Sequence, residues 1–497
     1  MKKLFLCMAC LFLFFCEKVL GADALFSMDS SFADYDGNRL FLRGNIVLEH
    51  SLGSICSDRA ELFKSRYDGH DHFDLFKLID NISIQMVDGG LLKCGQADID
   101  FHVLEGRFLA KPSDFVIYSE TYKNRNNQEI DLKLESQHMD ICLSQDPKGY
   151  TIKQIQAREG VSLYYGNNFR ALAEKAFFQR AEKRLFGNKF FHGTVTMEPQ
   201  DPHGLCHVFH GDSDWIKAKK IHVDSIEDVL FCEGVEGKMY AYKICGFGEE
   251  MQFSSSSLNW DEKNAMLKLG GSIFLEQNGI GQVRNKQELA LYWDRGLGGR
   301  DLREMSCMGE TSLYYFDEKN DVCFTLCCCG GMNINHSVLK ALFYSNIDNG
   351  FVPEDQQVFF QDGTGEVRGN TILVDYGIVK NKLQPVKVKV IGNVRVLNGC
   401  SESDEVKKKG LQYALADEAE LFLLSREVRL ISKEGRQVLF FDKEKNIEMS
   451  AQEIRAKRDL MTKGDSIRGI GVVRCSFEDK ELLRLKKAFN IDEYYGM

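Results

Sequence analysis

The chain has 497 residues, of which 44% are hydrophobic and 27% charged, so it can bury a large core and is too long for one ordinary domain. Its formal net charge of -10 argues against a general nucleic-acid binder, whose affinity comes from neutralised phosphates. With only 6 prolines and no Pro/Ser-rich linker, the sequence indicates a continuous chain.

The first 21 residues have the order of a secretory signal peptide. Lys2 and Lys3 precede an apolar run from Leu4 to Phe15, and the small residues Gly21 and Ala22 follow. The run has about 12 residues, whereas a helix needs roughly 20 to span a bilayer. We therefore predict a cleaved signal peptide over residues 1–21 and an exported mature chain.

Alternating apolar residues that follow a glycine recur along the mature chain. Such alternation predicts strands with one buried face. A clear case is Val386-Lys387-Val388-Lys389-Val390, where lysines and valines cannot share a dry face. The copies begin Gly44-Asn45-Ile46, Gly160-Val161-Ser162, Gly193-Thr194-Val195, Gly271-Ser272-Ile273 and Gly392-Asn393-Val394.

A second motif follows the first: a small residue, two polar residues, an alanine or aliphatic residue, any residue, then usually a large apolar one. Neighbouring copies of the first motif start about 38 residues apart, and larger gaps are near twice that. This period predicts stacked units of several short strands. Examples of the second motif are Ser57 to Leu62, Cys94 to Ile99, Ala173 to Phe178, Ala218 to Val223, Ala416 to Leu421 and Ala451 to Ala456.

The predicted fold is therefore all-β: an elongated, repetitive antiparallel array of β-jelly-roll, or β-taco, form. Helical periodicity is confined to the C-terminal tail, where Leu482, Leu485 and Phe489 share one face of a short helix from about Glu478. We divide the mature chain into β units over residues 22–145, 146–330 and 331–497, the last with the helical tail.

These motifs resemble the OstA/LptA family of periplasmic lipopolysaccharide-transport proteins. The resemblance is carried at the N-terminal end by Tyr35 to Leu48 followed by Ser57 to Leu62. Near the C-terminal end it is carried by Gly392-Asn393-Val394, Ala416 to Ala419, Asn446 to Gln452 and Ile467 to Val473. It is weak through the middle, which is degenerate, and the chain has room for about three such units where a typical member has one.

The resemblance implies a non-enzymatic periplasmic lipid-binding or bridge protein that carries lipopolysaccharide or a related glycolipid toward the outer membrane. It also implies partners among other transport proteins, joined through terminal edge strands. An acyl chain exposed to water costs roughly 0.8 kcal/mol per methylene, so such a lipid needs an apolar path. The predicted lipid-facing residues are Ile46, Leu48, Ile82, Ile84, Val161, Leu163, Val195, Met197, Val394, Val396, Val428, Leu430, Ile447 and Met449.

Catalytic and metal motifs are weak. There is no Gly-x-Ser-x-Gly elbow, His-Glu-x-x-His helix or P-loop, so we predict no enzyme, no cofactor and no metal. Two polar clusters contain ligand-type residues without convergent spacing: Asp68 to Asp74, and His203, Cys206, His207 and His210. Cys323 and Cys327 to Cys329 form the densest thiol cluster, for which disulfides and free thiols both remain open.

Two alternative functions remain open. An exported structural or surface β-repeat protein would share the signal and the strands. A polysaccharide-acting β-helix enzyme would also have short repeated strands, but with coils of about 20 to 25 residues. For an anionic glycolipid the densest basic region, Lys387, Lys389, Arg395 and Lys407 to Lys409, would supply the local cations.

Overall fold

The computed structural model confirms the all-β prediction: 78% of the residues lie in strands of a long antiparallel sheet and 1% are helical. It describes residues 27–476 except 65–72, 124–128, 147–148, 167–168, 186–187, 212, 226, 245–246, 278–280, 297–298, 318–321, 347–351, 363–364, 380–381, 399–411, 444–446 and 459–464. Within this part no helix is long and apolar enough to cross a membrane. The predicted signal peptide and C-terminal helix lie outside the described residues.

Contacts divide the chain into two compact units, Met1–Cys232 and Glu233–Met497. The three-unit division stays a prediction. The strands up to residue 224 are β1 (Ser27–Asp29), β2 (Phe32–Tyr35), β3 (Arg39–His50), β4 (Gly53–Lys64), β5 (Phe73–Met86), β6 (Leu91–Asp100), β7 (Glu105–Leu109), β8 (Val116–Lys123), β9 (Glu129–Ser136), β10 (His138–Asp146), β11 (Gly149–Tyr165), β12 (Phe169–Leu185), β13 (Asn188–Glu198), β14 (Cys206–His210), β15 (Asp214–Ala218) and β16 (Lys220–Asp224).

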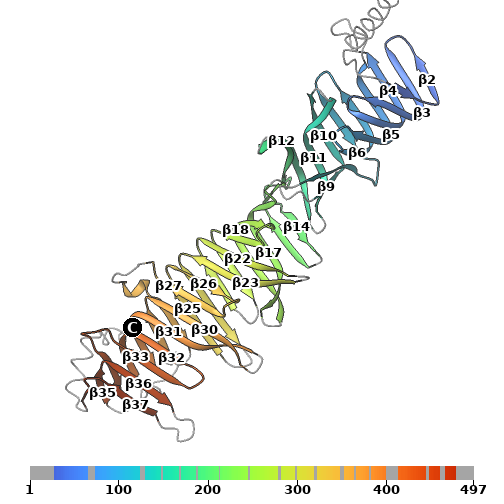
Figure 1. Ribbon diagram of the computed structural model, residues 1–497. Helices are drawn as coiled ribbons and strands as arrows, with labels where there is room; N and C mark the ends of the chain where they lie inside the picture. The colour runs from blue at the N-terminus through green and yellow to red at the C-terminus, as the bar shows by residue number, and fades with distance from the viewer. Residues whose placement is uncertain are drawn as a thin grey trace, which may run out of the picture. The chain divides into compact units, whose positions relative to one another are not determined.

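The later elements are β17 (Val229–Ile244), β18 (Phe247–Asp261), β19 (Met266–Gly270), β20 (Ile273–Gln277), β21 (Gly281–Asn285), β22 (Glu288–Gly296), β23 (Gly299–Met308), β24 (Thr311–Asp317), β25 (Val322–Cys328), β26 (Gly331–Asn335), β27 (Lys340–Tyr344), the 3-10 turn η1 (Glu354–Gln356), β28 (Val358–Asp362), β29 (Gly365–Gly369), β30 (Thr371–Val379), β31 (Lys382–Asn398), β32 (Gln412–Phe422), β33 (Glu427–Ile431), β34 (Val438–Asp442), β35 (Ile447–Ala451), β36 (Glu453–Arg458), β37 (Asp465–Ile470) and β38 (Arg474–Ser476). Figure 1 shows successive strands stacked beside one another in each unit.

Each unit has two facing sheets that share long, bent strands. In β6, Leu91–Lys93 pairs with β8 while Gln96–Asp100 pairs with β7. Strand β11 likewise pairs with β10 through its first half and with β9 through its second half. In unit 1 the first sheet contains β7, β10, β13 and β16, and the second contains β8, β9, β14 and β15. One strand thus passes from sheet to sheet, as in a jelly roll.

The described ladders are antiparallel, except for one parallel contact between Tyr242 of β17 and Asp301 of β23. A parallel β-helix would instead stack coil on coil in parallel register. The described part of the chain therefore does not have the fold that the polysaccharide-enzyme alternative requires.

The Gly-Asn motif marks the corner at which a strand changes sheets. Gly44 and Asn45 have φ of 81° and 46°, the left-handed region, and the β3–β4 register shifts between Arg43 and Ile46. Gly392 and Asn393 repeat this geometry in β31. Gly44 and Gly392 therefore lie inside long strands, whereas Gly271 lies between β19 and β20.

A recurrent hairpin lies at the edge of the two-sheet structure that is opposite the Gly-Asn corner. We call this edge the open margin, because no described strand passes from sheet to sheet there. A non-glycine residue ends each turn in the left-handed region, and its carbonyl accepts a hydrogen bond from a later strand, where the register shifts. The N–H of Leu143 donates to Leu104 at 2.8 Å, that of Trp293 to Ala265 at 3.0 Å, and that of Tyr376 to Leu339 at 2.9 Å. Corner and hairpin together give the sequence its long period.

Candidate functional site

The space between the two sheets is lined by unbroken rows of apolar side chains. In unit 1 each residue of a row is the register partner of the next, from β1 through β15 of the second sheet. All members except Met28 are buried. The row is Met28, Leu48, Ile55, Ile84, Leu92, Tyr118, Leu134, Leu163, Ala171, Val208 and Ile216.

The first sheet of unit 1 has a row of its own, which contains many small residues. The alanines of the second sequence motif, such as Ala60 and Ala97, lie in this row. Small side chains leave room for large ones opposite, as close packing requires. The row is Leu42, Ala60, Leu78, Ala97, Phe108, Met139, Ala157, Ala176, Met197 and Ile221.

Unit 2 repeats the arrangement. One of its sheets carries the row Leu258, Leu269, Leu289, Cys307, Met332, Phe343, Ile372, Val390, Ala419, Leu430 and Ile454. The other carries Phe253, Leu275, Val283, Leu313, Leu326, Phe360, Val367, Val396, Ala414, Phe440 and Met449.

The structure places the fourteen predicted lipid-facing residues on this interior side. Ile46, Leu48, Ile82, Ile84, Val161, Leu163, Val195, Met197, Val394 and Leu430 are buried. Val396, Val428, Ile447 and Met449 are half-buried. The interior is thus more accessible in the last strands of unit 2, and whether any of these side chains touches lipid stays a prediction.

The interior of unit 1 is closely packed. A cavity of about 10 Å³ lies between the sheets, lined by Leu52, Ile84, Met86, Leu92, Ile99, Gly106, Phe108, Ile141, Leu143 and Ile152. This volume is close to that of one water probe, far too small for an acyl chain. An acyl chain can therefore occupy this place only if the sheets move apart.

An aromatic cluster closes one stretch of the open margin of unit 1. His50 stacks on Tyr150 with a ring-centroid distance of 5.6 Å and an interplanar angle of 4°, and lies 4.4 Å from the ring of Phe101. Nearby, the Tyr150 N–H donates to the Ser51 carbonyl at 2.9 Å. Because the end of β3, the turn after β6 and the start of β11 meet here, apolar contact and a backbone hydrogen bond join the sheets.

This cluster predicts an acid-sensitive unit 1. Burial lowers the pKa of His50 from 6.5 to about 4, so the folded state favours the neutral ring. Stability is therefore lost as pH falls from about 6.5 toward 4, by up to about 3 kcal/mol. Urea denaturation between pH 7 and pH 4.5 measures this loss. His50→Phe keeps the aromatic contacts and should flatten the pH dependence relative to wild type; identical profiles would contradict the prediction.

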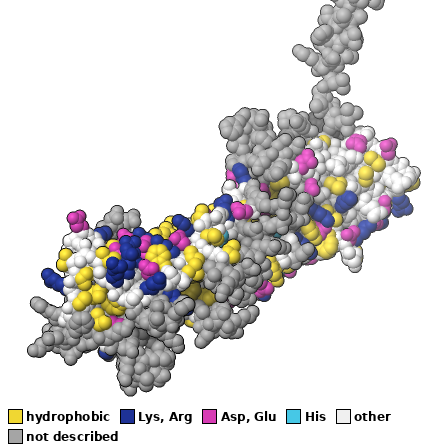
Figure 2. All heavy atoms as spheres, turned by 60° about the horizontal axis from the view of Figure 1, so that its bottom comes forward, with side chains coloured by type: hydrophobic (Ala, Val, Ile, Leu, Met, Phe, Trp, Pro, Cys, Tyr) yellow, Lys and Arg dark blue, Asp and Glu magenta, His cyan; other side chains and the backbone are white. Residues whose placement is uncertain are grey.

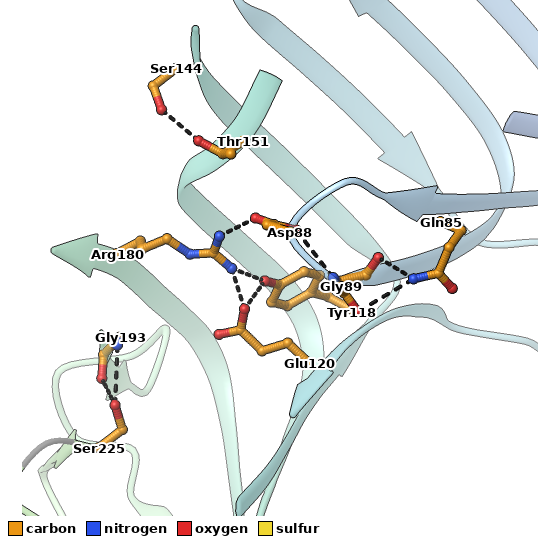
Figure 3. A network of polar contacts seen from close by, with 11 residues as sticks. Gln85, Asp88, Gly89, Tyr118, Glu120, Ser144, Thr151, Arg180, Gly193 and Ser225 are labelled. Atoms are coloured by element: carbon orange, nitrogen blue, oxygen red, sulfur yellow. Dashed lines mark hydrogen bonds and ion pairs between the residues drawn. The ribbon is translucent and has the colours of Figure 1, made fainter. Parts of the chain in front are cut away.

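A buried ionic network closes a second stretch of the open margin, as Figure 3 shows. Arg180 of β12 forms ion pairs with Asp88, in the β5–β6 turn, and with Glu120 of β8. It also donates to the Tyr118 hydroxyl at 2.8 Å, and that hydroxyl donates to Glu120 at 2.7 Å. Only 10% of the Arg180 side chain is exposed.

The network keeps Arg180 charged. Burial alone would lower its pKa, but Tyr118, Glu120 and Asp88 hold the pKa above its ordinary value. Burial raises the pKa of Tyr118 well above 10, so its hydroxyl stays protonated. The sequence motifs did not reveal this network, because its members lie on separate strands and carry no spacing signature.

The basic region proposed from sequence is paired on the outer surface. Lys387 lies 2.9 Å from Glu420, and Lys389 lies 2.8 Å from Glu418. Arg395 pairs with Glu354 of η1. Figure 2 shows Lys and Arg side chains interspersed with Asp and Glu over the visible face of the last strands. These three cations are therefore paired with carboxylates and are not an open cationic site for an anionic glycolipid. Lys407 to Lys409 lie outside the described residues.

The cysteine and histidine candidates do not converge in the described part of the chain. Cys206 is buried while His203 is exposed, and no group of three or more described His, Cys, Asp or Glu side chains could hold a metal. Asp68 to His72 lie outside that part.

The cysteines of the thiol cluster are free. Cys323 lies 3.3 Å from the Tyr314 hydroxyl, while burial raises the pKa of Cys328 to about 12. A thiol with this pKa stays protonated near neutral pH and is a poor nucleophile.

The described residues therefore form an apolar interior. In unit 1, aromatic rings close one stretch of its open margin and an ionic network closes another. No protein-family model and no curated protein sequence matches the chain.

Proposed function

We propose that the chain is a non-enzymatic, exported lipid-binding protein that bridges the periplasm in lipopolysaccharide or lipooligosaccharide transport. The supporting observation is the continuity of the interior rows, in which register partners remain apolar from strand to strand within each unit. A row of this kind offers an acyl chain the same environment at successive positions. Transfer from one strand to the next then costs little, because the side chains of the rows are apolar apart from the Tyr118 hydroxyl, which is hydrogen-bonded.

The end strands support partners that add further strands. At the N-terminal end β1 and β2 each pair with β3, and all their residues are exposed. At the other end of the described chain β37 pairs with β36, and β38 pairs with β35. The predicted terminal strand, Ile467 to Val473, thus covers the end of β37 and the corner that leads to β38. Edge strands of this kind accept a neighbouring protein through backbone pairing.

Photocrosslinking in the native envelope tests this function. A photoreactive residue at the inward position Leu163 should yield lipid adducts, whereas the same residue at the outward neighbour Ser162 should yield few. A photoreactive residue at Ala33 of β2 should capture other transport proteins. Equal lipid adducts from Leu163 and Ser162 would contradict an interior path.

An exported structural or surface β-repeat protein remains the alternative. It would use the same apolar rows only as a core, as their burial in unit 1 permits. In that case neither inward nor outward positions would yield lipid adducts.

A further inference from the structure

The ionic network of unit 1 joins its two sheets across the open margin. Arg180 lies in the half of β12 that pairs with β13 in the first sheet. Asp88 follows the end of β5 that pairs with β4 and β6 in the second sheet, and Glu120 lies on β8 of the same sheet. Arg180 therefore spans the gap between the sheets, and its side chain points toward both carboxylates in Figure 3.

The apolar interior begins directly behind this network. Tyr118, which contacts Arg180, is the register partner of Leu92. Leu92 lines the small cavity between the sheets. Phe178, two residues before Arg180 and fully buried, packs against Tyr118 with ring centroids 5.7 Å apart. A path from solvent through Arg180 and past Tyr118 therefore leads into the apolar rows.

We propose that this stretch of the margin is the portal by which an acyl chain enters the interior of unit 1, and that Arg180 is its latch. The proposal rests on the proposed lipid-binding function. Because the cavity is far smaller than an acyl chain, entry requires the sheets to part, and the contacts across the margin decide where they part first.

The two closed stretches of the margin differ in the nature of their contacts. Parting the cluster of His50, Phe101 and Tyr150 would expose apolar rings to water and break the hydrogen bond from Tyr150 to Ser51. Parting Arg180 from Asp88 and Glu120 instead transfers charged groups to water, which solvates them well and offsets most of the lost attraction. The ionic stretch is therefore the easier one to open.

The charges of the network also determine which class of ligand can enter. One guanidinium and two carboxylates give the network a net negative charge, which repels an anionic head group and does not act on a neutral hydrocarbon. The ligand that fits is an amphiphile whose acyl chain enters while its charged head stays in water.

Stopped-flow uptake of the methyl ester of a polyene fatty acid, whose fluorescence rises in an apolar environment and whose neutral head does not respond to the changed charge, tests the latch in the mature chain. Arg180→Met removes the cation but keeps an apolar stem, and should speed uptake about tenfold or more at an unchanged final signal. The control Asn81→Ala removes the hydrogen bond that Asn81 donates to Asp58 and the one that it accepts from Lys111, at a corner far along β5 from the latch, and should change the rate less than about twofold. Circular dichroism verifies that each variant is folded.

A milder variant keeps the test decisive if Arg180→Met does not fold. Glu120→Gln preserves the side-chain shape and removes one charge, and should speed uptake several-fold. Uptake by the latch variants that is no faster than wild type, or equally fast uptake by Asn81→Ala, overturns the portal while the lipid-binding function stands. Uptake that is faster than wild type in the latch variants but not in Asn81→Ala supports the portal. No uptake by any folded variant or by wild type overturns the lipid-binding function itself.

Discussion

Leu48→Asn should lower the free energy of unfolding of unit 1 by about 4 kcal/mol, because it places an amide in the interior row of the second sheet. Leu48 is fully buried between its register partners Met28 and Ile55. Since whole domains are stable by only about 5–15 kcal/mol, this loss is large. Urea unfolding followed by circular dichroism measures it.

The neighbouring substitution Val47→Asn is the matched control. Val47 is half-buried on the outer face of β3, opposite Cys56 and Asp29. It should cost about 1 kcal/mol, since the amide remains near water. Equal losses from the two substitutions would mean that the faces of β3 have been assigned wrongly.

Gly53→Ala should be about as damaging, for a backbone reason. Gly53 begins β4 with φ of +135°, and a Cβ there would lie 2.0 Å from the Gln85 carbonyl oxygen and 2.9 Å from the Met86 Cα. Neither neighbour is the flexible end of a side chain, so β4 and β5 would have to separate. We expect a loss of about 3 kcal/mol or more in thermal or urea unfolding.

Gly160→Ala separates this clash from backbone strain alone. Gly160 has φ of +66°, but nothing lies within 4 Å of the position of a Cβ. It should therefore cost only about 1–2 kcal/mol, the left-handed penalty of a residue with a side chain. If Gly53→Ala were as mild as Gly160→Ala, the close approach of β4 to β5 would be wrong.

The periodic pattern predicted the fold class and the buried face of many strands. Alternation works because successive side chains point to opposite faces, so Leu48 and Leu163 could be assigned to the interior from sequence alone. It failed at the corners, since alternation does not reveal that Gly44 and Asn45 turn a single strand from one sheet into the other. It also gave the Lys387 and Lys389 side chains no partners, because the carboxylates of Glu420 and Glu418 lie on another strand.

The margin contacts could not be predicted from sequence. Arg180 is separated from Asp88 by 92 residues and from Glu120 by 60, and only the strand order of two sheets brings these groups together. His50 and Tyr150 are likewise distant in sequence, and their stacking depends on the end of β3 meeting the start of β11 at the same margin. Long-range pairing of this kind follows from topology, which a local period does not specify.

Mass spectrometry of the mature chain, purified from its native envelope under non-denaturing conditions, tests the central claim most directly. If the interior rows carry acyl chains, the folded chain should appear with the added mass of a multi-acylated lipid, and that mass should leave on denaturation. Replacing Leu163, which is fully buried in the interior row, with Asp should lower the share of folded chains that carry the added mass. A folded wild-type chain that carries only its own mass, with no lipid in the denatured extract, would contradict the account.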